Sequence, residues 1–330
     1  MNAKSPPDLR SKYVNGRKKF WVQLIEAARL VLPRVAPPGP IIVKSSAGLG
    51  NRIYGALNAI AYAAKYDRPI SIDWADGMYG DLGENVFPLI FDLQGVRALS
   101  VRPDLFNPFP EFWIGRTTEF QNQVDAGVSW HDWPQLAANI DDWHLLGETA
   151  CDGYVYVSRS TYQRKVAFLM GLPLSAKTVF RRHLRFSKFA NDAIRQHATA
   201  TDSSWVGVHY RSTDLRTELS VAQVAALIKQ TNCRAVYWAS DNPATVHEAQ
   251  SLLPRHTIAS TPLADTLPLG HEPLHLSLGP AHRRAHLVGA LADLHALSQC
   301  GTVIRKRNST FSGFAIRVMA DRRPVERLID

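Results

Sequence analysis

The strongest constraint on the fold is the regular alternation of short apolar strands with helical segments in the second half of the chain. Runs typical of buried strands occupy residues 204–210, 235–240 and 301–304. Helical patterns cover residues 220–230, 242–253, 283–299 and 312–320. Because strands that alternate with helices build parallel sheets, this half predicts a doubly wound α/β unit.

The first half begins with a unit of the same kind. Residues 41–44 (IIVK) predict a buried strand, residues 51–65 a helix and residues 69–74 a second strand. The glycine turn at 45–50 could hold an anion on its backbone N–H groups, but GLGNR is not the dinucleotide fingerprint. We expect this turn to serve mainly as a connection. Residues 173–198 show a helical pattern that leads into the second half.

The bulk composition excludes several classes of protein. With 45% hydrophobic and 20% charged residues, the 330-residue chain is globular in composition. No apolar run approaches the roughly 18–20 residues of a membrane span, and the N-terminus lacks the order of a signal peptide. The three cysteines are odd in number and far apart, which argues against a disulfide framework or a metal cluster. We expect a cytoplasmic protein.

The net charge of +9 is concentrated at the two ends of the sequence. Residues 1–36 carry +6 and residues 301–330 carry +4, so the middle is slightly negative. This distribution does not favour a nucleic-acid partner, which usually meets a broad basic face. Residues 17–32 have helical periodicity, and the basic segment fits either a solvated tail with a helix packed on the body or peripheral contact with the inner face of a membrane through residues 10–34.

The segment VGVHYRSTDLRTE (206–218) carries the chemistry. It joins a buried strand to a charged turn, and ligands of open α/β sheets bind at the carboxyl ends of strands. If the strand continues through Arg211, the side chains of His209 and Arg211 lie on one side. A guanidinium suits a diphosphate, since it stays charged and donates to two oxygens at once.

Several ordered blocks of the chain resemble the α-1,6-fucosyltransferase family. The segment from Gly207 to Glu218 is similar to that family's GVHVR segment and the acidic residues after it. The other similar blocks are ISIDWADGMYGDLGENVFP (70–88), YWASDNP (237–243), EPLHLS (272–277) and ALADLHALSQCGTVIRKRNSTFSGFA (290–315). The resemblance covers roughly residues 41–92 and 204–318.

The resemblance implies a fold and an activity. The fold would be GT-B, with two Rossmann-like domains facing a central cleft: an acceptor-side domain at 41–198 and a nucleotide-sugar domain at 199–330, preceded by a basic leader or helix at 1–40. The activity would be inverting, metal-independent transfer of fucose from GDP-fucose to a hydroxyl of a GlcNAc-containing glycan or glycolipid. GDP-fucose would be the donor substrate, with no further cofactor.

The resemblance also implies roles for individual residues on the donor side. Arg211 would hold the β-phosphate, and His209 would support the diphosphate or the turn. Asp293 would face the nucleotide, and Asp241 would lie at a strand end nearby. The remaining donor-side residues are His275, in the PLH block, and Thr310, Phe311 and Ser312, which would line the diphosphate or base pocket.

The catalytic base is open between two carboxylates. An inverting transfer needs a group that takes the proton of the acceptor hydroxyl. Glu218 matches the family's acidic position only with a one-residue gap, and Asp214 competes with it. The eukaryotic enzymes have a second Arg at the position of Ser212, so one part of the phosphate contact is absent here, or Arg216 replaces it.

Metal and acceptor sites are less defined. The chain has no Asp-x-Asp motif, which agrees with a mechanism in which Arg211 replaces a cation, and the histidines from His271 to His295 have no acidic partners that would indicate a metal site. The aromatic-rich residues 75–160 either bind the acceptor sugar or form core. Three alternatives are open: a GT-B enzyme with another nucleotide sugar, a non-catalytic carbohydrate- or nucleotide-binding relative, and a nucleotide-binding oxidoreductase, which the missing fingerprint disfavours.

Overall fold

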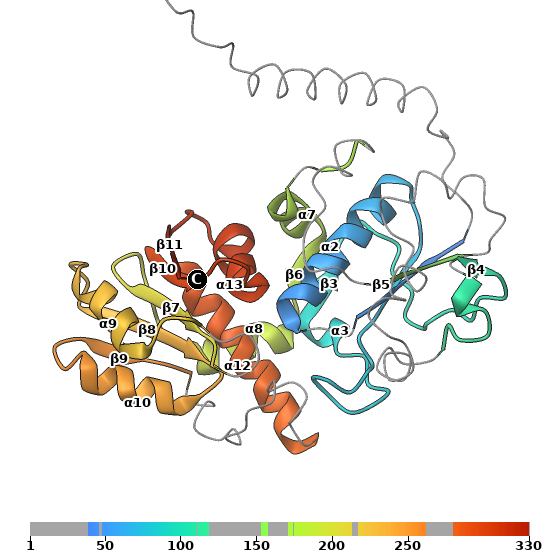
Figure 1. The fold of residues 1–330 in the computed structure, drawn as a ribbon. Helices are drawn as coiled ribbons and strands as arrows, with labels where there is room; N and C mark the ends of the chain where they lie inside the picture. The colour runs from blue at the N-terminus through green and yellow to red at the C-terminus, as the bar shows by residue number, and fades with distance from the viewer. Residues whose placement is uncertain are drawn as a thin grey trace, which may run out of the picture.

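The structure is a computed structural model that describes residues 39–45, 48–109, 111–118, 153–157, 171–173, 175–212, 217–261 and 280–329. These residues form a mixed α/β fold with two parallel sheets, one from each half of the chain (Figure 1). The helix expected at 17–32 lies outside the described residues. None of the described helices is both long and apolar enough to cross a membrane.

The first sheet has the order β2-β1-β5-β4 and all its pairings are parallel. It consists of β1 (Ile41–Lys44), β2 (Ile70–Asp73), β4 (Pro108–Phe109) and β5 (Gly153–Val157). Helix α2 (Leu49–Lys65) joins β1 to β2, as the sequence predicted. The apolar positions Ile53, Leu57 and Ile60 of that helix are fully buried.

The second sheet has the order β11-β10-β7-β8-β9 and is also parallel throughout. Its strands are β7 (Val206–Tyr210), β8 (Ala235–Ser240), β9 (Thr257–Ala259), β10 (Thr302–Lys306) and β11 (Val325–Ile329). The chain passes from β7 to β8 and β9 on one side, then returns to add β10 and β11 on the other. The topological switch point therefore lies between β7 and β10, where open α/β sheets bind ligands.

Helices cover both faces of this second sheet. In β7, β8 and β10, strand residues with even numbers, such as Val208 and Trp238, pack in one cluster with α9 (Val221–Lys229) and α10 (Pro243–Leu252). The odd-numbered residues of these three strands face α12 (Pro280–Gln299) and α13 (Thr310–Phe314). Gly207 is needed on that face, because a Cβ there would come within 2.9 Å of the Leu297 side chain of α12.

Two helices expected from the sequence are corrected. Residues 173–198 are not one helix: α7 (Ala176–His183) and α8 (Lys188–His197) flank the short strand β6 (Leu184–Phe186). Phe186 pairs with Phe91 of the antiparallel β3 (Phe91–Leu93) and stacks on its ring at 5.3 Å, and this tertiary contact overrides the helical pattern. The helix expected at 312–320 begins earlier, at Thr310, and continues as a π-helical turn, η4 (Ala315–Met319).

Candidate functional site

Arg211 begins the loop at the carboxyl end of β7. The strand ends at Tyr210, so the sheet does not continue through Arg211 as the same-side expectation required. The Arg211 backbone N–H donates to Thr217 Oγ1 at 3.2 Å, and its carbonyl accepts from the Thr217 N–H at 2.8 Å. These two bonds close the loop tightly. Its middle, residues 213–216 with Asp214, lies outside the described residues.

Asp241 fixes this loop from the end of the neighbouring strand β8. Its Oδ1 accepts from the Ser212 backbone N–H at 2.8 Å and from the Ser212 hydroxyl at 3.2 Å. Its Oδ2 lies 3.7 Å from Arg211 Nε. Asp241 therefore orients the loop, while the Arg211 side chain keeps 25% of its surface exposed. A guanidinium held in this way can meet an anion from solvent.

His209 is a buried, neutral imidazole next to Arg211. Burial lowers its pKa to about 3, with further contributions from the positive charges of Arg211 and Arg305. The ring stacks on Phe311 at 5.3 Å, and Nδ1 lies 3.2 Å from Ser309 Oγ. Because Ser309 Oγ already accepts from the Ser312 N–H, its own proton is available for Nδ1. When Ser309 donates to Nδ1, the imidazole proton lies on Nε2, and Nε2 is then a neutral donor.

The backbone between β10 and α13, residues 306–309, is held by the buried guanidinium of Arg305. Arg305 Nη1 donates to the carbonyl oxygens of Lys306 at 3.0 Å, Arg307 at 3.1 Å and Ser309 at 3.3 Å. Its Nη2 donates to Glu326 Oε2 of β11 at 2.8 Å. Arg305 thus ties the loop that carries Ser309, the partner of His209, to the edge strand of the sheet.

Glu326 is the anion that compensates Arg305. Burial alone would raise its pKa, but hydrogen bonds from Arg317, Arg305 and Arg323 lower the pKa of Glu326 to about 2. The carboxylate therefore stays ionised at every physiological pH.

The start of α13 lies directly against the start of α2. A Cβ on Gly50 would come within 2.6 Å of the Phe311 backbone nitrogen, so only glycine permits this approach. Thr310 and Phe311 are partly exposed, whereas Ser312 is fully buried and its hydroxyl has no hydrogen-bond partner in the described parts of the chain. The glycine turn of the first half is therefore more than a connection: it meets the candidate site of the second half.

Asp293 forms a second polar cluster on the same face of the second sheet. Its Oδ1 accepts from the Tyr237 hydroxyl at 2.6 Å and from the Thr261 hydroxyl. Burial raises the pKa of Asp293 to about 6, although these hydrogen bonds oppose the shift. Both bonds end on Oδ1. Tyr237 and His209 occupy odd positions on adjacent strands, so both side chains project toward the α12 side of the sheet.

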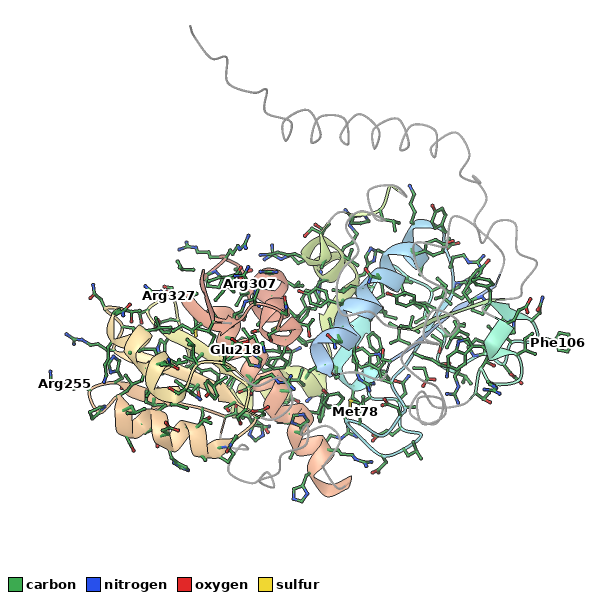
Figure 2. The ribbon with its side chains drawn as sticks, viewed as in Figure 1. Met78, Phe106, Glu218, Arg255, Arg307 and Arg327 are labelled. Atoms are coloured by element: carbon green, nitrogen blue, oxygen red, sulfur yellow. The ribbon has the colours of Figure 1, made fainter. Side chains whose placement is uncertain are left out.

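The other residues chosen from the sequence are placed less decisively. Glu218 is exposed, and Figure 2 shows it near the middle of the molecule. Asp214 and His275 lie outside the described residues. Among the aromatic residues of the irregular region, Trp113 is fully buried and belongs to the core, whereas Phe106 is 91% exposed.

Sequence reasoning missed Ser309, Arg305 and Glu326. Ser309 precedes a helix, and its hydroxyl caps the Ser312 N–H, so a capping signal was present in the sequence. Nothing in the sequence distinguished Arg305 from its basic neighbours, because its burial and its pairing with Glu326 depend on tertiary structure. In the portion of the chain that the structure describes, no three His, Cys, Asp or Glu side chains gather as they would around a metal ion.

Comparisons with known proteins identify the fold. No family model matches the chain, and no curated protein sequence matches it. Among solved structures, it is similar to NodZ α-1,6-fucosyltransferase soaked with GDP-fucose, at 18% identity and a TM-score of 0.58, over 85% of this chain and 92% of that chain. It is similar to fucosyltransferase NodZ from Bradyrhizobium at 19% identity and a TM-score of 0.57, over 85% and 94% of the chains. At such identities the likeness shows the fold, and it confirms the α/β fold that the sequence resemblance implied.

Proposed function

We propose that the chain is a glycosyltransferase that moves fucose from GDP-fucose to a hydroxyl of a GlcNAc-containing glycan. The observation that carries the proposal is the cluster of Arg211, His209 and Ser309 at the switch point of a sheet with the NodZ fold. One NodZ structure was soaked with GDP-fucose and another was co-crystallised with GDP. Both facts support a guanine nucleotide as the ligand of this cluster.

The donor would lie along the α12 side of the second sheet. Arg211 and the Nε2–H of His209 supply donors for the diphosphate at the switch point. Asp293 would supply a carboxylate to the guanine of the nucleotide. Its hydrogen bonds from Tyr237 and Thr261 both end on Oδ1, so Oδ2 would face the ligand. Guanine presents two neighbouring donors, N1–H and N2–H, which match a carboxylate. Adenine and uracil lack this pair of adjacent donors.

The transfer step would use the charge of Arg211. The acceptor hydroxyl oxygen forms a bond to C1 of fucose while the bond from C1 to the β-phosphate oxygen breaks, and the configuration at C1 inverts. The leaving GDP gains negative charge, which Arg211 stabilises in the role that a metal has elsewhere. The proton of the acceptor hydroxyl passes to a carboxylate, for which Glu218 and Asp214 are the candidates.

The two halves of the chain would bind the two substrates. We propose a GT-B arrangement with an acceptor-side domain at 41–198 and a donor domain at 199–330. The contact of Gly50 with Phe311 supports a donor site at the junction of the two. The basic leader at 1–40 would extend from a cytoplasmic enzyme, and its residues 10–34 would contact the inner face of a membrane.

A donor panel tests the proposal. Purified chain is incubated with GDP-fucose, GDP-mannose, UDP-GlcNAc and a set of chitooligosaccharides, and released nucleotide is measured. We expect GDP release from GDP-fucose that rises when an acceptor is added. Faster turnover of another nucleotide sugar would show that GDP-fucose is not the preferred donor. Binding of GDP without turnover of any donor would indicate a non-catalytic relative.

A further inference from the structure

A basic surface lies on the folded body, outside the candidate donor site. It is formed by α7 with the start of β6 (residues 175–185) and by η4 with β11 (residues 315–329). The two segments contain eight Lys and Arg residues and two carboxylates, a net charge of +6. Since the leader at 1–36 also carries +6 and the whole chain only +9, the rest of the chain is negative. The positive charge is therefore strongly localised.

The two segments form one continuous surface. Lys177 Nζ of α7 donates to the carbonyl of Ala320, and Arg181 pairs with Asp321 at 2.6 Å. From there, Arg323 and Arg317 pair with Glu326 of β11 at 2.8 and 3.0 Å. Figure 1 shows α7, α13 and β11 along the same upper side of the molecule.

Positive charge exceeds what the two carboxylates can neutralise. Asp321 and Glu326 already serve Arg181, Arg317 and Arg323. Arg182 and Arg322 are exposed, Arg327 is half-buried, and none of these three side chains makes a hydrogen bond or ion pair with any residue that the structure describes. These three guanidinium groups are available to an anionic partner.

Two exposed aliphatic side chains accompany the arginines. Val325 and Leu328 of the edge strand β11 are 62% and 42% exposed, and they flank the edge of the sheet on its two opposite faces. Arginine next to exposed aliphatic groups suits the boundary between lipid headgroups and acyl chains. Proteins that bind single-stranded nucleic acid usually stack its bases on exposed aromatic rings. No aromatic side chain is among the exposed large hydrophobic side chains of the described residues on this surface.

We propose that this basic surface docks the folded body on an anionic lipid bilayer. The leader would be a separate contact, so the enzyme would meet the membrane at two places. Lipid phosphates would pair with Arg182, Arg322 and Arg327, while Val325 and Leu328 would rest at the acyl boundary. The surface would thereby set how the body is oriented on the bilayer.

The test compares two triple variants of the full chain. The first carries Arg182→Gln, Arg322→Gln and Arg327→Gln. Binding is measured by co-sedimentation with phosphatidylcholine vesicles that do or do not contain phosphatidylglycerol. Each cation near an anionic surface contributes roughly a fivefold effect, so we expect binding to phosphatidylglycerol vesicles to weaken on the order of 100-fold.

The control variant removes the same charge elsewhere. It carries Lys229→Gln, Arg234→Gln and Arg255→Gln, three exposed cations at the far end of the second half. Figure 2 shows Arg255 at the left edge of the molecule, below the upper side on which Arg327 lies. We expect this variant to bind vesicles within about twofold of the parent, because exposed charges beyond a Debye length of about 8 Å contribute little. Circular dichroism checks that both variants fold.

Three results would overturn the proposal. If both triple variants bound phosphatidylglycerol vesicles equally more weakly than the parent, the attraction would depend on net charge and not on this surface. Unchanged binding of the first variant would assign it to the leader alone. A parent chain that binds single-stranded RNA through Arg182, Arg322 and Arg327 but does not bind phosphatidylglycerol vesicles would make the partner a nucleic acid.

Discussion

Replacing Glu326 with Gln should destabilise the fold and weaken donor binding together. The substitution keeps the shape of the side chain but removes the charge that compensates the buried Arg305. The pKa of Glu326 lies near 2 instead of 4.5, and each unit corresponds to about 1.4 kcal/mol, so the folded state gains at most about 3 kcal/mol from this carboxylate. Part of that gain comes from Arg317 and Arg323, which are more exposed, so we expect a loss of about 2 kcal/mol at pH 7.

The pH dependence of this loss follows from the direction of the pKa shift. A depressed pKa means that the stabilisation is complete above the unfolded value near 4.5 and disappears as the pH falls toward 2. The difference in unfolding free energy between parent and Glu326→Gln should therefore be largest at pH 7 and should shrink below about pH 4.5. Urea unfolding followed by tryptophan fluorescence at several pH values measures it.

A matched control separates this carboxylate from an ordinary surface charge. Asp321 also pairs with an arginine, Arg181, but it is 91% exposed. Asp321→Asn should leave the urea midpoint nearly unchanged. Calorimetric titration with GDP supplies the second readout, since Glu326→Gln releases Arg305 and with it the 306–309 backbone next to His209. A pH-independent difference, or normal GDP affinity in Glu326→Gln, would refute the role given to Arg305.

Three further predictions concern the donor site. Arg211→Ala should reduce GDP release from GDP-fucose on the order of 10²–10³-fold, and Arg211→Lys should also fail because a point charge does not reproduce the forked contact; a folded variant with near-normal release would contradict this. Affinity for GDP should fall as the pH drops below about 6, where Asp293 becomes protonated. The Asp293→Asn variant should bind GDP weakly at every pH. It should nevertheless unfold at a higher temperature than the parent at pH 7.5, because the raised pKa of Asp293 means that its ionised carboxylate destabilises the folded state. EDTA should leave GDP release unchanged, and a loss that manganese or magnesium restores would disprove the role of Arg211 as the replacement for a cation.

Local patterns were enough to predict most of the second sheet. The strands β7, β8 and β10 and the helices α9, α10 and α12 lie close to their expected positions, because each follows a clear apolar pattern, and α9 and α10 also begin at a cap. Asn242, for example, accepts from the Ala244 N–H at the start of α10. Strand β6 could not be predicted in this way, since the helical pattern of 173–198 is broken only by its contact with Phe91.

The candidate site was predictable only in part. His209 lies near the end of a predicted strand and Arg211 directly follows it, and the structure places both at the switch point of the sheet. The contribution of Gly50 was not visible, because the sequence cannot show that two helix starts 261 residues apart meet. The neutral state of His209 was equally hidden, since it results from burial and from the nearby charges of Arg211 and Arg305.

Exposure and ion pairing distinguish Arg211 from the other interior cations. Lys44, Arg52 and Arg305 are at most 1% exposed, and they lie 3.0, 2.5 and 2.8 Å from their carboxylates. If a ligand displaced one of these carboxylates, the buried cation would lose its compensating charge, which would destabilise the protein. The carboxylate of Asp241 is 3.7 Å from Arg211 and is already engaged by Ser212, and the Arg211 side chain is a quarter exposed. The diphosphate proposed to bind here would therefore meet a guanidinium that is a quarter exposed, whereas each of the other three cations is at most 1% exposed and lies within 3.0 Å of its carboxylate.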